Sequence, residues 1–201
     1  VSNIAGLNRD AMLAEHIKRG GDADRFGELV SVTHEQVLQP LFWLSDKDSE
    51  QGIDSFIKPG DFVALDEIWR FWQGFGLKDS EGGRRPDRVM NFLRMHGHFT
   101  HPETGYCCEV AFITQELGDF HRSARAVIEE TYRMTKLVVI GSAKRYRVDI
   151  FPRGRTTGRP IRSIQRAYNP DLFGFYSSHS QRKEGDAAAI EDSPDQRGNI
   201  L

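Results

Sequence analysis

The chain has 201 residues, of which 38% are hydrophobic and 28% are charged, and its formal net charge is −2. This composition predicts one globular domain with a hydrophobic core, and no apolar stretch approaches the roughly 18 residues that span a bilayer. Val1 opens a polar segment rather than a basic and apolar leader, so no signal peptide is predicted. The adjacent Cys107 and Cys108 predict reduced thiols and a cytosolic compartment, because a vicinal disulfide is strained.

In chain order, the first half of the sequence has clear boundaries between predicted elements. An amphipathic helix is expected over residues 9–19, where Gly20 and Gly21 end it, and a short strand over 29–32. Residues 61–66 and 109–114 are apolar runs that predict two buried strands, and residues 88–96 have helical periodicity between them.

The second half is predicted to contain a helix over 119–135 and then a β-hairpin. The hairpin joins the β-rich runs 137–140 and 146–151 through Gly141 and Ser142. The tail from residue 181 is polar and is predicted to be loosely ordered. Short strands separated by helical stretches favour an α/β fold, with a mainly parallel sheet flanked by helices and a late β-hairpin.

The net charge conceals an uneven distribution along the chain. Residues 1–83 carry 8 basic and 15 acidic side chains, whereas residues 122–183 carry 14 basic and 4 acidic ones. The densest part is 144–166, with eight basic residues and Asp149 as its one acid. Three interpretations are open: a solvated basic face, a surface for the phosphates of nucleic acid or anionic lipid, or a contact with the acidic half of a neighbouring subunit.

Two adjacent carboxylates, Asp66 and Glu67, follow the apolar run of residues 62–65. Ligands on α/β sheets bind at the carboxyl ends of the strands, and an apolar strand that ends in Asp-Glu is the Walker B pattern of P-loop nucleotide hydrolases. There the Asp holds Mg²⁺, which prefers oxygen ligands, and the Glu orients and deprotonates the attacking water. The alternative is an ordinary acidic turn at a strand end.

A second polar pair, Thr114 and Gln115, follows the strand predicted over 109–114. Gln115 is placed to hydrogen-bond the attacking water or to sense the γ-phosphate, if the two strands are neighbours. The alternative is a turn without a function. The phosphate-binding motif GxxxxGK[ST] is not found anywhere in the sequence.

Other groups of residues carry weaker hypotheses. The histidines and cysteines between residues 96 and 108 lack the spacing of a zinc site, so a polar connection is favoured there. Arg122 and Arg125 are candidates for an arginine finger that acts on a neighbouring subunit, or are ordinary surface residues.

Several of these motifs, in this order, resemble the zonular occludens toxin (Zot) family, which includes the inner-membrane assembly ATPase of filamentous phages. The stretches that carry the resemblance are VSNIAGL at 1–7, LDE at 65–67, FLRMHGH at 92–98, FITQ at 112–115, FGFYSS at 173–178 and DQRGNIL at 195–201. The resemblance covers nearly the whole chain.

The resemblance implies a P-loop NTPase-like domain over residues 1–180 that lacks its N-terminal P-loop strand and helix, because Val1 aligns just after the family's Walker A segment. Residues 181–201 would be a polar linker toward a transmembrane segment beyond residue 201. In the family's terms Asp66 binds Mg²⁺ and the nucleotide, while Glu67 and Gln115 are catalytic.

The family also implies a homo-oligomer that uses ATP and Mg²⁺ at the cytoplasmic face of the inner membrane. The oligomer would export phage DNA and coat proteins. The basic segment 144–166 is a candidate surface for contacting them. Two other functions remain open, a non-catalytic interaction fragment and a secreted toxin-like effector that acts on tight junctions. A GxxxxGK[ST] motif encoded just upstream of Val1 would favour the ATPase.

Overall fold

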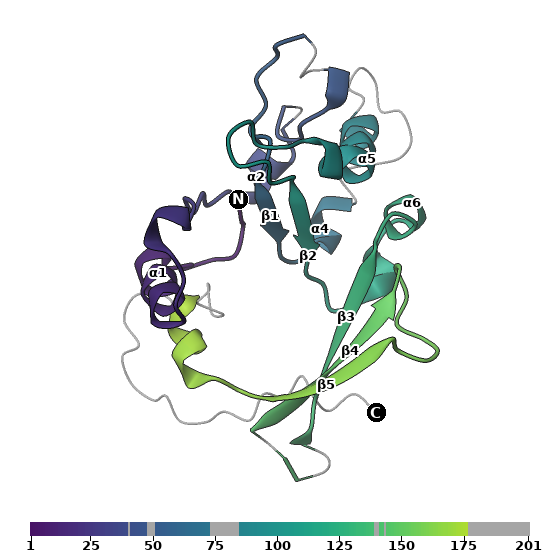
Figure 1. Cartoon of the computed structure of the whole chain (residues 1–201). Helices are drawn as coiled ribbons and strands as arrows, with labels where there is room; N and C mark the ends of the chain where they lie inside the picture. The colour runs from purple at the N-terminus through teal and green to yellow at the C-terminus, as the bar shows by residue number, and fades with distance from the viewer. Residues whose placement is uncertain (40, 48–50, 73–84, 139–140, 143, 177–201) are drawn as a thin grey trace, which may run out of the picture.

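The computed structural model describes residues 1–176 except 40, 48–50, 73–84, 139–140 and 143 (Figure 1). The predicted linker 181–201 lies outside the described residues. The helices are α1 (Arg9–Lys18), α2 (His34–Val37), α4 (Trp69–Trp72), α5 (Arg85–Met95) and α6 (Arg122–Arg125), with 3₁₀ turns η1 (Ala23–Arg25), η2 (His96–His98), η3 (Leu117–Asp119) and η5 (Pro170–Phe175). The strands are β1 (Phe62–Leu65), β2 (Glu109–Phe112), β3 (Glu130–Lys136), β4 (Arg145–Pro152) and β5 (Arg162–Ala167).

The strands β1 and β2 are parallel neighbours, as the sequence predicted. Leu65 pairs with Phe112 at their carboxyl ends. The chain start extends this arrangement on the other side of β1, since Ser2 forms parallel bridges to Ala64 and to Ser31. The strand expected over 29–32 is therefore reduced to a single bridge.

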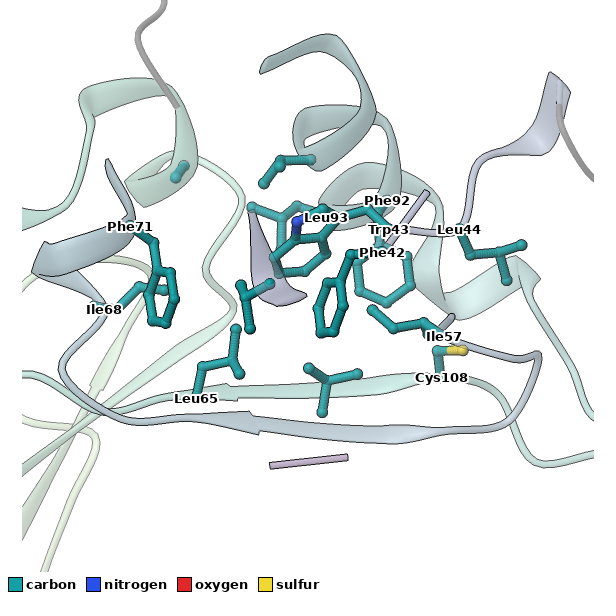
Figure 2. Close-up of a cluster of buried hydrophobic side chains, with 14 of the residues drawn as sticks. Phe42, Trp43, Leu44, Ile57, Leu65, Ile68, Phe71, Phe92, Leu93 and Cys108 are labelled. Carbon is teal, nitrogen blue, oxygen red and sulfur yellow. The ribbon is translucent and has the colours of Figure 1, made fainter. Parts of the chain in front are cut away.

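The hydrophobic core lies against β1 and β2 (Figure 2). Strand β1 alternates, so Val63 and Leu65 are fully buried while Phe62 is 54% exposed. The α5 helix contributes Phe92 and Leu93 from its apolar side, which confirms the predicted helical periodicity. Further buried side chains come from the loops before β1 and from the α4 turn, including Phe42, Trp43, Ile57, Ile68 and Phe71.

The prediction of a helix over residues 119–135 is wrong. A single helical turn, α6, is followed by strand β3 from Glu130 onward. Residues of β3 such as Thr131, Tyr132 and Thr135 suit a pleated strand, and pairing with β4 overrides the helical tendency of the segment.

The predicted late hairpin is present, but its first strand was misplaced. It pairs β3 with β4 in antiparallel register, from Glu130 opposite Pro152 to Lys136 opposite Tyr146. Gly141, at a φ of 77°, lies in the connection, as the sequence indicated. A third strand, β5, was not predicted. The strands in the described part of the chain form a parallel pair and an antiparallel three-stranded sheet, so the prediction of a mainly parallel sheet is wrong.

The antiparallel sheet is attached to the rest of the chain at both ends (Figure 1). At one end, the connection between β4 and β5 packs on α6, where a Cβ on Gly154 would lie 2.5 Å from the carbonyl oxygen of Arg125. At the other end, η5 returns the chain to α1, and the Asn8 N–H donates to the carbonyl oxygen of Phe175 at 2.9 Å.

Candidate functional site

The candidate site lies at the carboxyl ends of β1 and β2. Beyond the last paired residues the two chains stay together, because the Ile113 N–H donates to the carbonyl oxygen of Leu65 at 2.8 Å. The next contact brings the Ile68 N–H to the carbonyl oxygen of Ile113 at 3.3 Å. The segments that carry Asp66 and Gln115 therefore leave the sheet at the same edge, as expected.

The backbone of Asp66 is held from both sides by one side chain. The Asn3 Nδ2 group donates to the carbonyl oxygen of Asp66 at 2.9 Å, and the Asp66 N–H donates to Asn3 Oδ1 at 2.7 Å. The side-chain amide thus reproduces the pattern of a neighbouring strand. The sequence places Asn3 only within the motif at residues 1–7, because a polar residue after a short extended segment does not indicate such a role locally.

Glu67 occupies a left-handed backbone conformation, with a φ of 51°. This region costs a residue with a Cβ about 1 kcal/mol or more. The turn is supported by the Glu67 N–H, which donates to Asp66 Oδ1 at 2.7 Å, and by Ile68 and Phe71, which are buried directly after it. The core therefore fixes a turn in which one oxygen of the Asp66 carboxylate is used locally.

The carboxylate of Glu67 pairs with Arg70 one turn further on, at 2.9 Å between Oε2 and Nε. Both side chains are about half exposed, at 46% and 51%. An ion pair of this exposure contributes about 0–1 kcal/mol, so solvent or a ligand can replace Arg70 at little cost. Sequence reasoning missed Arg70, although an i,i+3 acid–base pair is a recognisable signal.

Gln115 is exposed in the loop after β2. Within the described part of the chain its side chain has no hydrogen-bond partner. The loop around it is shaped by Thr114, whose hydroxyl donates to the carbonyl oxygen of Glu116 at 3.2 Å. The structure thus brings Gln115 to the same edge as Asp66 and Glu67 without assigning it a contact.

The family model for zonular occludens toxin (Zot) matches residues 1–183. The chain belongs to the Zot family. This match spans both sheets and the whole candidate site of the Zot-family chain. No curated protein and no solved structure matches it.

The residues at this edge are compatible with Mg²⁺ held together with a nucleotide. Such an ion takes one or two carboxylates, phosphate oxygens and water. In this Zot-family chain Asp66 supplies a half-buried carboxylate on a fixed backbone, and Glu67 follows directly. The phosphate-binding motif that would complete the site is not part of these 201 residues.

The histidines and cysteines between residues 96 and 108 were the other candidates for a metal site in this Zot-family chain. Among the described residues, no group of three or more His, Cys, Asp or Glu side chains is placed to hold a metal ion. Cys107 and Cys108 are free thiols, and Cys108 is fully buried, with its Sγ 3.3 Å from the carbonyl oxygen of Lys58. Burial raises the pKa of the Cys108 thiol.

The structure gives the positions of the candidate arginines and of the basic segment but does not test their roles. Arg122 and Arg125 lie on α6, where an arginine finger toward a neighbouring subunit stays a prediction. The basic segment 144–166 covers β4, the β4–β5 connection and most of β5. Within the described residues no helix is both long and apolar enough to cross a membrane.

Proposed function

We propose that this Zot-family chain supplies the Walker B half of the ATP site in a filamentous-phage assembly ATPase. The protein would act as a homo-oligomer at the cytoplasmic face of the inner membrane and would drive the export of phage DNA and coat protein. The observation that supports the proposal is the shared edge of β1 and β2. There the Asp66–Glu67 turn, clamped by Asn3, lies beside the loop that carries Gln115.

The roles follow from the chemistry of the side chains. The Mg²⁺ ion, when bound with ATP, neutralises charge on the phosphates. Asp66 is suited to hold it, because its backbone is fixed by two hydrogen bonds to Asn3 and its carboxylate is oriented by the Glu67 N–H.

Glu67 is suited to accept a proton from the attacking water. Its carboxylate is half exposed and needs to give up only the exposed contact with Arg70. Gln115, from the loop after β2, offers an amide that can donate to a phosphate oxygen or to a water and can accept from a water. These three side chains leave the sheet at one edge, which is the geometric requirement for their joint action.

The test is ATP hydrolysis by the protein extended upstream to include a GxxxxGK[ST] motif. Glu67→Gln removes the base and keeps the shape, so we expect turnover to fall about 10²–10⁴-fold while nucleotide binding is retained. Glu28→Gln, on an exposed residue outside the site, is the matched control and should leave turnover unchanged. Unchanged hydrolysis by Glu67→Gln would refute the role of Glu67.

The 201-residue chain alone provides a second measurement. Because it lacks the phosphate-binding motif, we expect weak or undetectable ATP binding in calorimetry. Micromolar binding would show that the site is complete without that motif and that the assignment of a half-site is wrong. If the upstream sequence encodes no GxxxxGK[ST] motif and the extended protein binds no ATP, a non-catalytic interaction protein becomes the better description.

A further inference from the structure

The antiparallel sheet has two chemically different faces. In an antiparallel pair, residues directly opposite one another project to the same side. Tyr132 lies opposite Ile150, and Met134 opposite Val148, which is itself opposite Ile164. These residues form one side of the sheet, which we name the apolar face: Tyr132, Met134, Val148, Ile150 and Ile164.

The apolar face is incompletely covered in the single chain. Tyr132 is 59% exposed and Met134 is 64% exposed, and the other three side chains are half-buried. The hydrophobic core against β1 and β2 includes no described residue of β3, β4 or β5, and the one buried hydrophobic side chain among the described residues of these strands is Phe151 of β4, on the opposite side of the sheet. A three-stranded sheet normally buries its apolar side against another layer, so we expect a binding partner to cover this face.

Aromatic residues extend the apolar face toward η5. Tyr146 lies on the same side of the sheet, and its ring is 4.9 Å from that of Tyr168. Phe173 follows at 6.4 Å from Tyr168 and is 56% exposed. The apolar surface therefore continues from the middle of the sheet to one end of it.

Basic side chains border the apolar face. Arg162 lies opposite Ile150, while Lys136 and Arg166 both lie opposite Tyr146. One acid, Glu130, lies on the same side, at the far end of β3, where its carboxylate accepts a hydrogen bond from the Tyr132 hydroxyl at 2.5 Å. The border of this face is therefore predominantly cationic.

The opposite face of the sheet carries the buried Phe151 opposite Thr131, and toward the middle of the sheet it is polar and partly neutralised. There the buried Asp149 accepts hydrogen bonds from Arg147 Nε at 2.9 Å and from the Ser163 hydroxyl at 2.5 Å. Arg133 is directly opposite Asp149 on the same side. The basic segment is thus divided between two faces, and only one of them combines cations with exposed apolar side chains.

We propose that the apolar face docks onto the surface of an anionic lipid bilayer. Apolar and aromatic side chains with a basic border are the composition of surfaces that bind at the boundary between headgroups and acyl chains. The rings of Tyr132 and Tyr146 suit that boundary, because each has an apolar body and a polar tip. The proposal is independent of ATP hydrolysis and goes beyond it.

The combination of cations with exposed apolar side chains disfavours two other occupants. A second copy docked by the same face would bring Arg162 and Arg166 toward the equivalent cations of its partner, in an isologous contact. A DNA backbone would satisfy the arginines, but it would leave the exposed side chains of Tyr132 and Met134 without a function. An anionic bilayer satisfies both the cations and the apolar side chains.

The test is flotation of the 201-residue chain with lipid vesicles. We expect binding to vesicles of equal parts phosphatidylglycerol and phosphatidylcholine, and little binding to phosphatidylcholine alone. Arg162→Gln with Arg166→Gln should weaken the partition about fivefold per arginine lost. The matched control is Arg155→Gln with Arg159→Gln, on exposed residues of the β4–β5 connection, which should change the partition less than twofold.

A second pair of variants tests the contribution of the apolar side chains to vesicle binding. Met134→Ser should weaken vesicle binding about tenfold, whereas Ile17→Ser, on α1 and 50% exposed, should not. Circular dichroism and urea unfolding of each variant check that the fold is retained.

Four results would overturn the proposal. They are unchanged flotation of Met134→Ser, equal binding to neutral and anionic vesicles, an equal loss with the control arginine pair, and flotation that is absent from the start. If Met134→Ser instead abolishes binding to a short DNA duplex, or converts an oligomer to monomers in sedimentation, the face has a different occupant and the lipid assignment is wrong.

Discussion

Replacing Asn3 by Ala tests whether the Asp66 turn is held from the neighbouring chain segment. The variant removes two hydrogen bonds, at 2.9 and 2.7 Å, both to the backbone of Asp66. Each is worth about 1 kcal/mol net, and the half-buried N–H and carbonyl groups left behind raise the total to about 2–3 kcal/mol. With an m-value of about 2 kcal/mol/M, the midpoint of urea unfolding should fall by about 1–1.5 M.

Asn8 provides the matched control for this substitution. Its Oδ1 accepts a single hydrogen bond, from the Ala11 N–H at 3.0 Å, at the exposed start of α1. Asn8→Ala should therefore cost about 1 kcal/mol, the usual value of a helix N-cap. Asn3→Asp keeps the acceptor and loses the donor, so it should fall between the wild-type chain and Asn3→Ala.

Amide hydrogen exchange distinguishes loss of the two Asn3–Asp66 hydrogen bonds from a general loss of stability. Amide exchange of residues 66 and 67 should accelerate in Asn3→Ala more than amide exchange within α5 does, because only the turn loses its partner. The reasoning is refuted if Asn3→Ala costs no more than Asn8→Ala, or if exchange at the turn is unchanged.

Three further predictions follow from the described geometry. The free energy of unfolding of Glu67→Gly should be about 1 kcal/mol higher than that of Glu67→Ala, because glycine adopts the φ of 51° without strain. Urea unfolding of both variants measures the difference, and a less stable Glu67→Gly would contradict the argument from strain. Gly154→Ala should destabilise the protein by about 2 kcal/mol or more, since its Cβ would meet a backbone oxygen at 2.5 Å, whereas Gly97→Ala, which faces open space, should change the melting temperature little. At pH 8 a thiol reagent should modify Cys107 rapidly and Cys108 only on unfolding, because burial shields Cys108 and its raised pKa lowers the thiolate fraction; mass spectrometry of the native protein decides, and rapid double labelling would refute it.

The parallel pair of strands was predictable because its signals are local. Two apolar runs, each ended by polar residues, correspond to β1 and β2 within one or two residues. The helix predicted over 9–19 is α1, whose start at Arg9 is capped by Asn8. In β1 and β2 the local preference and the tertiary packing agree, which is why the edge that carries Asp66 and Gln115 could be located from sequence, whereas α1 was predicted as an amphipathic helix but buries none of its side chains.

The antiparallel sheet could not be located in the same way. The segment before and within β3 is rich in Ala, Arg and Glu, which favour a helix, and only pairing with the distant β4 makes it a strand. The clamp by Asn3 is likewise long-range, since it joins residues that are 63 positions apart. The left-handed backbone conformation of Glu67 could not be predicted from the sequence, because that conformation is usually occupied by Gly or Asn.

The two proposals concern parts of the molecule with separate physical support. Glu67 is held by the core against β1 and β2, whereas Met134 lies on a sheet that contributes no described residue to that core. Effects of substitutions at sites without shared partners are additive, so loss of vesicle binding in Met134→Ser says nothing about hydrolysis, and loss of hydrolysis in Glu67→Gln says nothing about lipid. A protein that hydrolyses ATP but ignores anionic vesicles would keep the Walker B assignment and require another partner for the apolar face.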